Sequence, residues 1–112
     1  MFDLLPVQQN YVWGRNSHDS MVFNVLKANY PQNHNFDLEA TYAELWMGQH
    51  KSGENFVRNP QTGEIEKIGD FLKQNYNEEL PFLYKILSVK NCLSIQAHPT
   101  KELAKILHES SP

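Results

Sequence analysis

Residues 81–98 read Pro-Phe-Leu-Tyr-Lys-Ile-Leu-Ser-Val-Lys-Asn-Cys-Leu-Ser-Ile-Gln-Ala-His, and this stretch decides the fold class. Two apolar runs, 81–89 and 93–98, are separated by a short turn at Lys90 and Asn91. The side chains of these runs sort into two faces at a period of two residues, which is typical of strands. We therefore predict two consecutive strands, over 81–89 and 93–98.

Further strands are predicted upstream of this stretch. Residues 1–13 alternate loosely and predict an opening strand, and residues 42–47 predict a second one. Two short segments, Phe-Val-Arg at 56–58 and Glu-Ile-Glu at 64–66, flank a loop with the Pro and Gly content of a hairpin turn. Residues 14–17, Gly-Arg-Asn-Ser, are predicted to form a turn. The chain is therefore expected to be mainly β.

Three short helices are predicted between and after these strands. The first begins after Ser17 or Ser20, either of which could act as its N-cap, and it ends before Pro31, because proline disfavours helical backbone in the preceding residue. The second spans residues 68–76, and the third begins after Thr100. The apolar positions expected to face the core are Val22, Val25, Leu26, Ile68, Phe71, Leu72, Leu103, Ile106 and Leu107.

Length and composition limit the possible functions. With 112 residues the chain is one domain or a piece of one. Its 40% apolar and 21% charged residues are ordinary for a globular protein, and its net charge of −3 disfavours nucleic acid or an anionic membrane as a partner. No apolar run reaches the ~20 residues of a membrane helix, and the N-terminus lacks the features of a signal peptide. The single cysteine, Cys92, excludes an internal disulfide, so we expect a cytoplasmic protein.

One face of the predicted strand 93–98 carries the residues with the clearest chemistry. Ser94, Gln96 and His98 share this face, because strand side chains alternate. Imidazole is the commonest metal ligand in proteins, and an amide oxygen adds a hard donor. Two residues at i and i+2 lie about 6.6 Å apart at Cα, so Gln96 and His98 could converge on one ion. The alternative is a polar stripe that faces solvent.

Two charged residues on predicted strands suggest a pocket wall. Lys85 shares a face with apolar residues, where a lysine is costly unless it snorkels to solvent or meets an anion. Glu44 lies between Tyr42 and Trp46 on one strand face, an arrangement that would suit a polyol. The alternative for Glu44 is an exposed acid on an amphipathic strand. We expect both charges to lie nearer the Gln96 pocket than the exposed rim.

Several of these segments resemble sequence blocks of one enzyme family. Residues 42–50, Tyr-Ala-Glu-Leu-Trp-Met-Gly-Gln-His, resemble the block YAELWMGTH of type I mannose-6-phosphate isomerases. Residues 80–89 resemble the block LPFLFKVLSV, residues 93–99 the block LSIQAHP, and residues 9–14 the opening strand of the family. The blocks follow the family's order across nearly the whole chain.

The resemblance implies a cupin-type jelly roll with short helices. Residues 1–112 would be the N-terminal part of its catalytic domain, with no second domain. The family binds one zinc ion, and the resemblance implies Gln96 and His98 as two of its ligands. The other two, a Glu and a His, would lie beyond residue 112.

The implied reaction is the reversible conversion of mannose 6-phosphate to fructose 6-phosphate, which feeds GDP-mannose synthesis. The implied enzyme is cytoplasmic, monomeric at full length, and binds a small sugar phosphate. The resemblance implies Ser94 and Lys85 as residues of the substrate pocket, and we predict that Glu44 and Trp13 also bind the substrate. No residue of this chain is assigned as catalytic.

The chain departs from the family pattern at its end. The block NHKPE, which carries the third zinc ligand, has no match here. We therefore expect an N-terminal fragment with half of the zinc site, inactive by itself. Two alternatives stay open: a non-catalytic cupin-like domain that binds sugars or regulates, and a fragment that does not fold without the rest of the protein.

Overall fold

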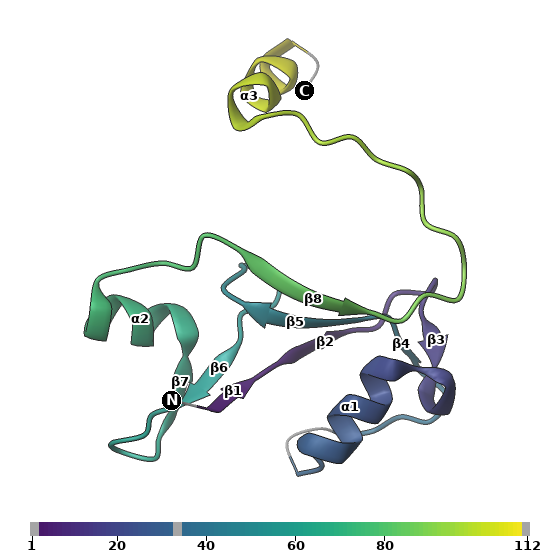
Figure 1. The fold of residues 1–112 in the computed structure, drawn as a ribbon, viewed down its shortest axis with the longest axis vertical. Coiled ribbons are helices and arrows are strands. Elements are labelled where there is room, and N and C mark those ends of the chain that lie inside the picture. Colours follow the sequence, from purple (N-terminus) through teal and green to yellow (C-terminus); the bar gives the residue numbers. More distant parts are fainter. Residues whose placement is uncertain (1–2, 33–34, 111–112) are drawn as a thin grey trace.

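The computed structural model describes residues 3–32 and 35–110 of the chain (Figure 1). Short strands and three α-helices follow one another along the sequence. Their bounds are β1 Asp3–Leu5, β2 Val7–Gln9, β3 Arg15–Asn16, the 3-10 turn η1 Ser17–Asp19, α1 Met21–Asn29, β4 Thr41–Tyr42, β5 Glu44–Gly48, β6 Phe56–Arg58, β7 Ile65–Lys67, α2 Ile68–Tyr76, β8 Leu83–Leu87 and α3 Lys101–Ser110.

All sheets are small and antiparallel. One sheet has the order β2-β5-β8, a second has the order β1-β6-β7, and β3 pairs with β4. Pro6 separates β1 from β2, so the predicted opening strand is shared between two sheets; proline has no N–H to donate to a ladder. Residues 10–13 lie outside the strands, and residues 1–2 of the prediction lie outside the described residues.

One core cluster lies between α1 and the β2-β5-β8 sheet. Val22, Phe23 and Leu26 of α1 are fully buried and pack with Leu45, while Ile86 is partly buried against them. The residues of β5 on the opposite face are Glu44 and Trp46, because strand side chains alternate. One face of this sheet is therefore closed by a helix, and the other carries the polar residues.

Ser20 is the N-cap of α1, which confirms one of the two predicted alternatives, Ser17 and Ser20. The backbone N–H of Phe23 donates to Ser20 Oγ at 3.3 Å, and Ser20 Oγ donates to the carbonyl of Tyr42 at 2.8 Å. The helix ends at Asn29, with Tyr30 as its C-cap before Pro31, which confirms the predicted end. The Ser20 hydroxyl thus fixes both the start of α1 and its distance from β4.

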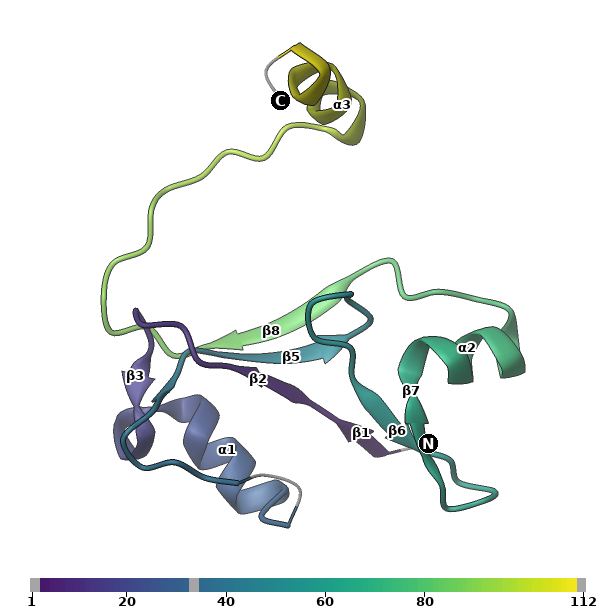
Figure 2. The ribbon, with the colours of Figure 1, turned by 180° about the vertical axis from the view of Figure 1, so that it is seen from behind.

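A second core cluster lies under α2, at the opposite end of the sheets from α1 (Figures 1 and 2). Val57, Ile68 and Phe71 are its buried members, and Leu72 packs against them. The predicted hairpin β6–β7 and the predicted helix 68–76 are both confirmed, the helix with the expected bounds.

Ser88 joins three elements just after β8. Its N–H donates to the Ala43 carbonyl at 2.8 Å, its carbonyl accepts from the Arg15 N–H at 3.0 Å, and its hydroxyl accepts from the Met21 N–H at 3.1 Å. The side chain is buried. Ser88 therefore connects Ala43, the residue before the central strand, with β3 and the start of α1.

Two predictions about secondary structure are wrong. Residues 14–17 do not form a simple turn, because Arg15 and Asn16 pair with Tyr42 and Thr41, which lie far along the sequence. Residues 93–98 form no strand, and the predicted strand 81–89 is shortened to β8, with an isolated bridge at Val89. A strand needs a partner, and the alternating pattern of 93–98 does not name one.

The segment after β8 runs away from the sheets and carries α3 with it (Figures 1 and 2). Ile95 is fully exposed, and the apolar residues of α3, predicted to face a core, are exposed as well. The N-terminus of α3 is formed as predicted, since the Leu103 N–H donates to Thr100 Oγ1 at 3.3 Å. No helix in the described residues is long and apolar enough to cross a membrane.

Candidate functional site

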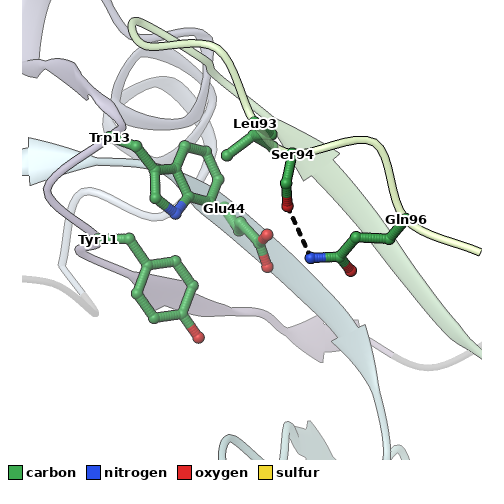
Figure 3. A pocket seen from close by; sticks show the side chains of 6 residues that line it. All are labelled: Tyr11, Trp13, Glu44, Leu93, Ser94 and Gln96. Atoms are coloured by element: carbon green, nitrogen blue, oxygen red, sulfur yellow. Dashed lines mark hydrogen bonds between the residues drawn. The ribbon is translucent and has the colours of Figure 1, made fainter.

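A pocket of about 300 Å³ opens on the polar side of the central sheet (Figure 3). Three segments line it: the loop after β2, the first residue of β5, and the segment after β8. The lining residues are Tyr11, Trp13, Glu44, Leu93, Ser94 and Gln96. Residues that are far apart in the sequence thus face one space.

Glu44 supplies the charge of this pocket. Its side chain is only 10% exposed, and one of its oxygens, Oε2, accepts a hydrogen bond from the indole N–H of Trp46. The same oxygen lies 3.2 Å from Lys85 Nζ. The register of the sheet explains this contact, because Trp46 of β5 is paired with Lys85 of β8 and Glu44 lies two residues before Trp46.

Lys85 is held between the carboxylate and an aromatic ring. Its Nζ lies 4.4 Å from the centre of the Trp46 ring, within the range of a cation–π contact. The lysine is not among the residues that line the pocket, and it reaches the pocket's border through Glu44. The side chain of Glu44 is 10% exposed and that of Lys85 is 37% exposed, and the placement of both charges at a pocket formed by Gln96 and His98 stays a prediction.

Trp13 and Tyr11 form the aromatic wall. Their rings stack at 5.6 Å between centres, with an angle of 27° between the planes. The backbone positions this wall, since the Trp13 carbonyl accepts from the N–H groups of Lys90 and Asn91. Tyr11 is a site residue that the sequence analysis does not name. Its i, i+2 spacing to Trp13 is the signal that indicates it, although residues 11–13 lie in a loop and turn and not in the predicted strand.

Ser94 and Gln96 form the third side of the pocket. The amide nitrogen of Gln96 donates to Ser94 Oγ at 2.9 Å, which leaves the amide oxygen of Gln96 available as an acceptor (Figure 3). His98 lies two residues further along the extended segment and is not among the residues that line the pocket. Gln96 and His98 are predicted to point to the same side of one strand. The strand is wrong, because residues 93–98 form none, and the common side of the two side chains stays a prediction.

The donors present here are compatible with part of a zinc site. An amide oxygen and an imidazole nitrogen are both suitable donors, and the hydrogen bond to Ser94 leaves the Gln96 oxygen free for such a role. Within residues 3–32 and 35–110, no group of three or more His, Cys, Asp or Glu side chains gathers to hold a metal. These two donors are therefore fewer than the three protein ligands of a typical catalytic zinc.

Solved structures of phosphomannose isomerases share the fold of this chain. A variant of phosphomannose isomerase from Salmonella typhimurium superposes with a TM-score of 0.72 at 28% identity, over 99% of this chain and 29% of that one. A zinc-bound mannose 6-phosphate isomerase superposes with a TM-score of 0.68 at 28% identity, over 97% of this chain and 28% of that one. The small antiparallel sheets and short helices match this fold.

Sequence comparisons identify the family. A family profile described as "Phosphomannose isomerase type I, catalytic domain" matches residues 1–112. Mannose-6-phosphate isomerase of Schizosaccharomyces pombe is 41% identical over 119 residues, which cover 100% of this chain and 28% of that protein. The enzyme of Bos taurus is 38% identical over 122 residues, covering 100% of this chain and 29% of that protein. This chain belongs to the type I phosphomannose isomerase family, and it spans less than a third of the length of these relatives.

Proposed function

We propose that the complete protein containing these residues is a zinc-dependent isomerase that interconverts mannose 6-phosphate and fructose 6-phosphate. The observation that carries this proposal is the pocket in which Trp13, Glu44, Ser94 and Gln96 meet. These residues come from three segments that also match the family profile. A carboxylate, a hydroxyl, an amide and two aromatic rings suit the hydroxyl groups and apolar ring faces of a sugar.

Interconversion of an aldose and a ketose moves a proton between C1 and C2. The C–H bond beside a carbonyl is a weak acid, and a bound zinc ion would supply the positive charge that stabilises the enediolate. Gln96 and His98 would hold one ion together with a Glu and a His from beyond residue 112. Ser94 would bind sugar hydroxyls, Glu44 would form part of the pocket wall, and Lys85 would add a positive charge at the border of the pocket. We assign no general base among the residues of this chain.

Several finer statements belong to the same proposal. The reaction would feed GDP-mannose synthesis, the complete enzyme would be cytoplasmic and monomeric, and residues 1–112 would form the N-terminal part of a cupin-type catalytic domain. The exposed, unpaired thiol of Cys92 supports the cytoplasmic location, because extracellular proteins usually pair their cysteines.

A second candidate function is a non-catalytic domain that binds sugars or regulates. The absence of His98 from the pocket lining favours this alternative, because the sugar-binding wall then holds only one of the two proposed metal ligands, Gln96. The two candidates differ in whether a metal is needed. A sugar-binding domain would bind mannose 6-phosphate equally well before and after chelation.

The test is a coupled isomerase assay of the complete gene product and of residues 1–112, each with and without a chelator. We expect chelator-sensitive turnover by the complete protein and little or none by residues 1–112, because two ligands hold and orient zinc poorly. Robust chelator-sensitive turnover by residues 1–112 would show that other ligands come from within this chain. Sugar-phosphate binding without turnover by the complete protein would establish the non-catalytic alternative.

A further inference from the structure

The two oxygens of the Glu44 carboxylate have different surroundings. Oε2 accepts the indole N–H of Trp46 and also faces Lys85 Nζ at 3.2 Å. Oε1 accepts no hydrogen bond from the described part of the chain, residues 3–32 and 35–110. Most of the interaction of this buried carboxylate is therefore directed at its own neighbours and not at the pocket.

Lys85 depends on this carboxylate for its position. A lysine side chain has four rotatable bonds and a compact charge, so a free ammonium on a strand surface samples many places. Here the Nζ atom is held between Glu44 Oε2 and the Trp46 ring at 4.4 Å, while 37% of the side chain stays exposed. The ammonium is thus held on one side and open on the other.

We propose that Glu44 is a positioning residue that acts through Lys85. Its carboxylate fixes the ammonium against the Trp46 ring at the border of the pocket, so that an anionic or hydroxyl-rich ligand meets a charge that is already oriented. This inference rests on the proposed isomerase function and deepens it. The rival role for Glu44 is a direct contact with the substrate through Oε1.

A double-mutant cycle in the complete enzyme separates the two roles. The variants are Glu44→Gln, which keeps the shape of the side chain and removes its charge, Lys85→Met, and the pair together. If Glu44 acts through Lys85, we expect Glu44→Gln to lower kcat/KM by roughly tenfold or more when Lys85 is present, and by less than about twofold in the Lys85→Met background. An equal loss in both backgrounds would overturn the proposal in favour of direct substrate contact.

A matched control comes from another ion pair in the described part of the chain, Glu54 with Lys67. Glu54 Oε2 lies 3.8 Å from Lys67 Nζ, away from the pocket, and the two side chains are 25% and 56% exposed. Glu54→Gln removes a carboxylate from a comparable pair. We expect it to change kcat/KM by less than about twofold, because exposed pairs contribute little. A loss as large as that of Glu44→Gln would mean that any lost ion pair has this effect, and the positioning role would be withdrawn.

A spectroscopic measurement tests the positioning role without using activity. An ammonium held by a carboxylate and a ring gives a resolved 15N–1H signal for Lys85, which Lys85→Met assigns by its disappearance. We expect Glu44→Gln to abolish or broaden this signal while Glu54→Gln leaves it unchanged. An unchanged Lys85 signal in Glu44→Gln would overturn the positioning role. A wild-type protein that shows the signal but no turnover would instead contradict the proposed isomerase function.

Trp46→Phe keeps the test open if Glu44→Gln does not fold. It removes the indole N–H bond to Oε2 and retains an aromatic ring beneath the ammonium. We expect the same pattern as for Glu44→Gln with a smaller amplitude, roughly threefold in kcat/KM with Lys85 present and none in the Lys85→Met background. A loss that is independent of Lys85 would again exclude positioning.

Discussion

Hydroxyl groups at Ser20 and Ser88 connect elements that the sequence separates widely. Ser20 bonds both the first turn of α1 and the carbonyl of Tyr42, and Ser88 Oγ accepts from the N–H of Met21. Both side chains are buried, so water does not replace these bonds when they are lost. At the scale of single residues, the placement of α1 on the sheet depends on these two serines.

The first prediction concerns Ser20→Ala. The variant loses an N-cap and leaves the Tyr42 carbonyl with one bond fewer, so the free energy of unfolding should fall by about 1–3 kcal/mol. Urea denaturation followed by circular dichroism measures it. Ser17→Ala is the matched control, because the Ser17 hydroxyl makes no hydrogen bond within residues 3–32 and 35–110, and it should cost under about 0.5 kcal/mol. Equal losses for the two variants would contradict the role of Ser20 as the cap.

The second prediction concerns Gly14→Ala. A Cβ at Gly14 would lie 2.6 Å from both the Cα and the Cβ of Ala43, so backbone would have to shift. We expect a loss of about 1–3 kcal/mol in the free energy of unfolding and a changed environment of the adjacent Trp13. Denaturation and tryptophan fluorescence measure the two effects.

Gly63→Ala is the comparison for this variant. Gly63 has a φ of 76° and open space around its Cβ position, so alanine there costs only backbone strain of about 1–2 kcal/mol. It should leave Trp13 fluorescence unchanged. If Gly14→Ala also leaves the fluorescence unchanged, the contact with Ala43 does not position the aromatic wall.

At the scale of elements, α3 stands apart from the rest of the chain and is stabilised by its own first turn. Hydrogen bonds from its own backbone N–H and from the Thr100 side chain hold the pKa of Glu102 below its ordinary value. A carboxyl group whose pKa is lowered in the helix stabilises that helix at pH values above the ordinary pKa of the group. The stabilisation is lost as the pH falls through the lowered pKa. The helix is therefore expected to weaken on acidification.

The third prediction is that the helical chemical shifts of residues 101–110 decrease as the pH falls from the ordinary glutamate pKa of about 4.3 through the lowered pKa of Glu102. Backbone NMR of the chain over a pH series measures this change. Glu102→Gln removes the titrating group and should flatten the pH dependence near the start of α3. A pH dependence of unchanged size in that variant would show that another group controls the helix.

The sequence predicts the elements whose signals are local, and it fails where a distant partner decides. Ser20, Pro31 and the apolar spacing of 68–76 fix α1 and α2, and the Pro and Gly of loop 59–63 fix the hairpin. Residues 15–16 form a strand only because Tyr42 and Thr41 lie beside them, and the pattern of 93–98 is that of a strand that finds no partner here.

The candidate site was predictable to the extent that each residue could be judged on its own strand. Glu44 and Lys85 were singled out as charges in apolar or aromatic surroundings, and the structure brings them within 3.2 Å of each other. The sequence does not predict that Trp46 is their common partner. That role depends on the pairing of β5 with β8, which places Lys85 opposite Trp46. The zinc and substrate roles of Gln96, His98, Ser94 and Trp13 stay predictions.

At the scale of the whole molecule, protection of the backbone is very uneven. The central strand β5 has strands on both sides, whereas residues 92–99 accept and donate no backbone hydrogen bonds within the described ranges. Apolar side chains follow the same contrast, since Leu45 is buried while Ile95, Leu103 and Ile106 are exposed. Backbone amides of the sheet and of the segment after β8 should therefore exchange with solvent at different rates.

The fourth prediction is that hydrogen–deuterium exchange of residues 1–112 is fast at 92–99 and slowest in β5. Amides of β5 exchange only through opening of the sheet, whereas an extended unpaired segment is open at all times. Mass spectrometry of peptic fragments measures both regions in one experiment. In the complete protein the same segment should become protected if downstream residues cover it. Fast exchange at 92–99 in both proteins would contradict the idea that this segment borders a closed pocket.

The order of strands in the central sheet has a consequence for synthesis on the ribosome. β5 lies between β2, which is made before it, and β8, which is made well after it, and Ser88 completes the connection to β3 and α1. Translation at ~5–20 residues per second separates β5 from β8 by several seconds. Throughout that interval the nascent chain presents a hydrophobic central strand with one open edge, and the Met21 N–H at the start of α1 lacks its bond to Ser88. We therefore expect chaperones at the ribosomal exit to bind the emerging polypeptide until β8 has emerged and paired with β5.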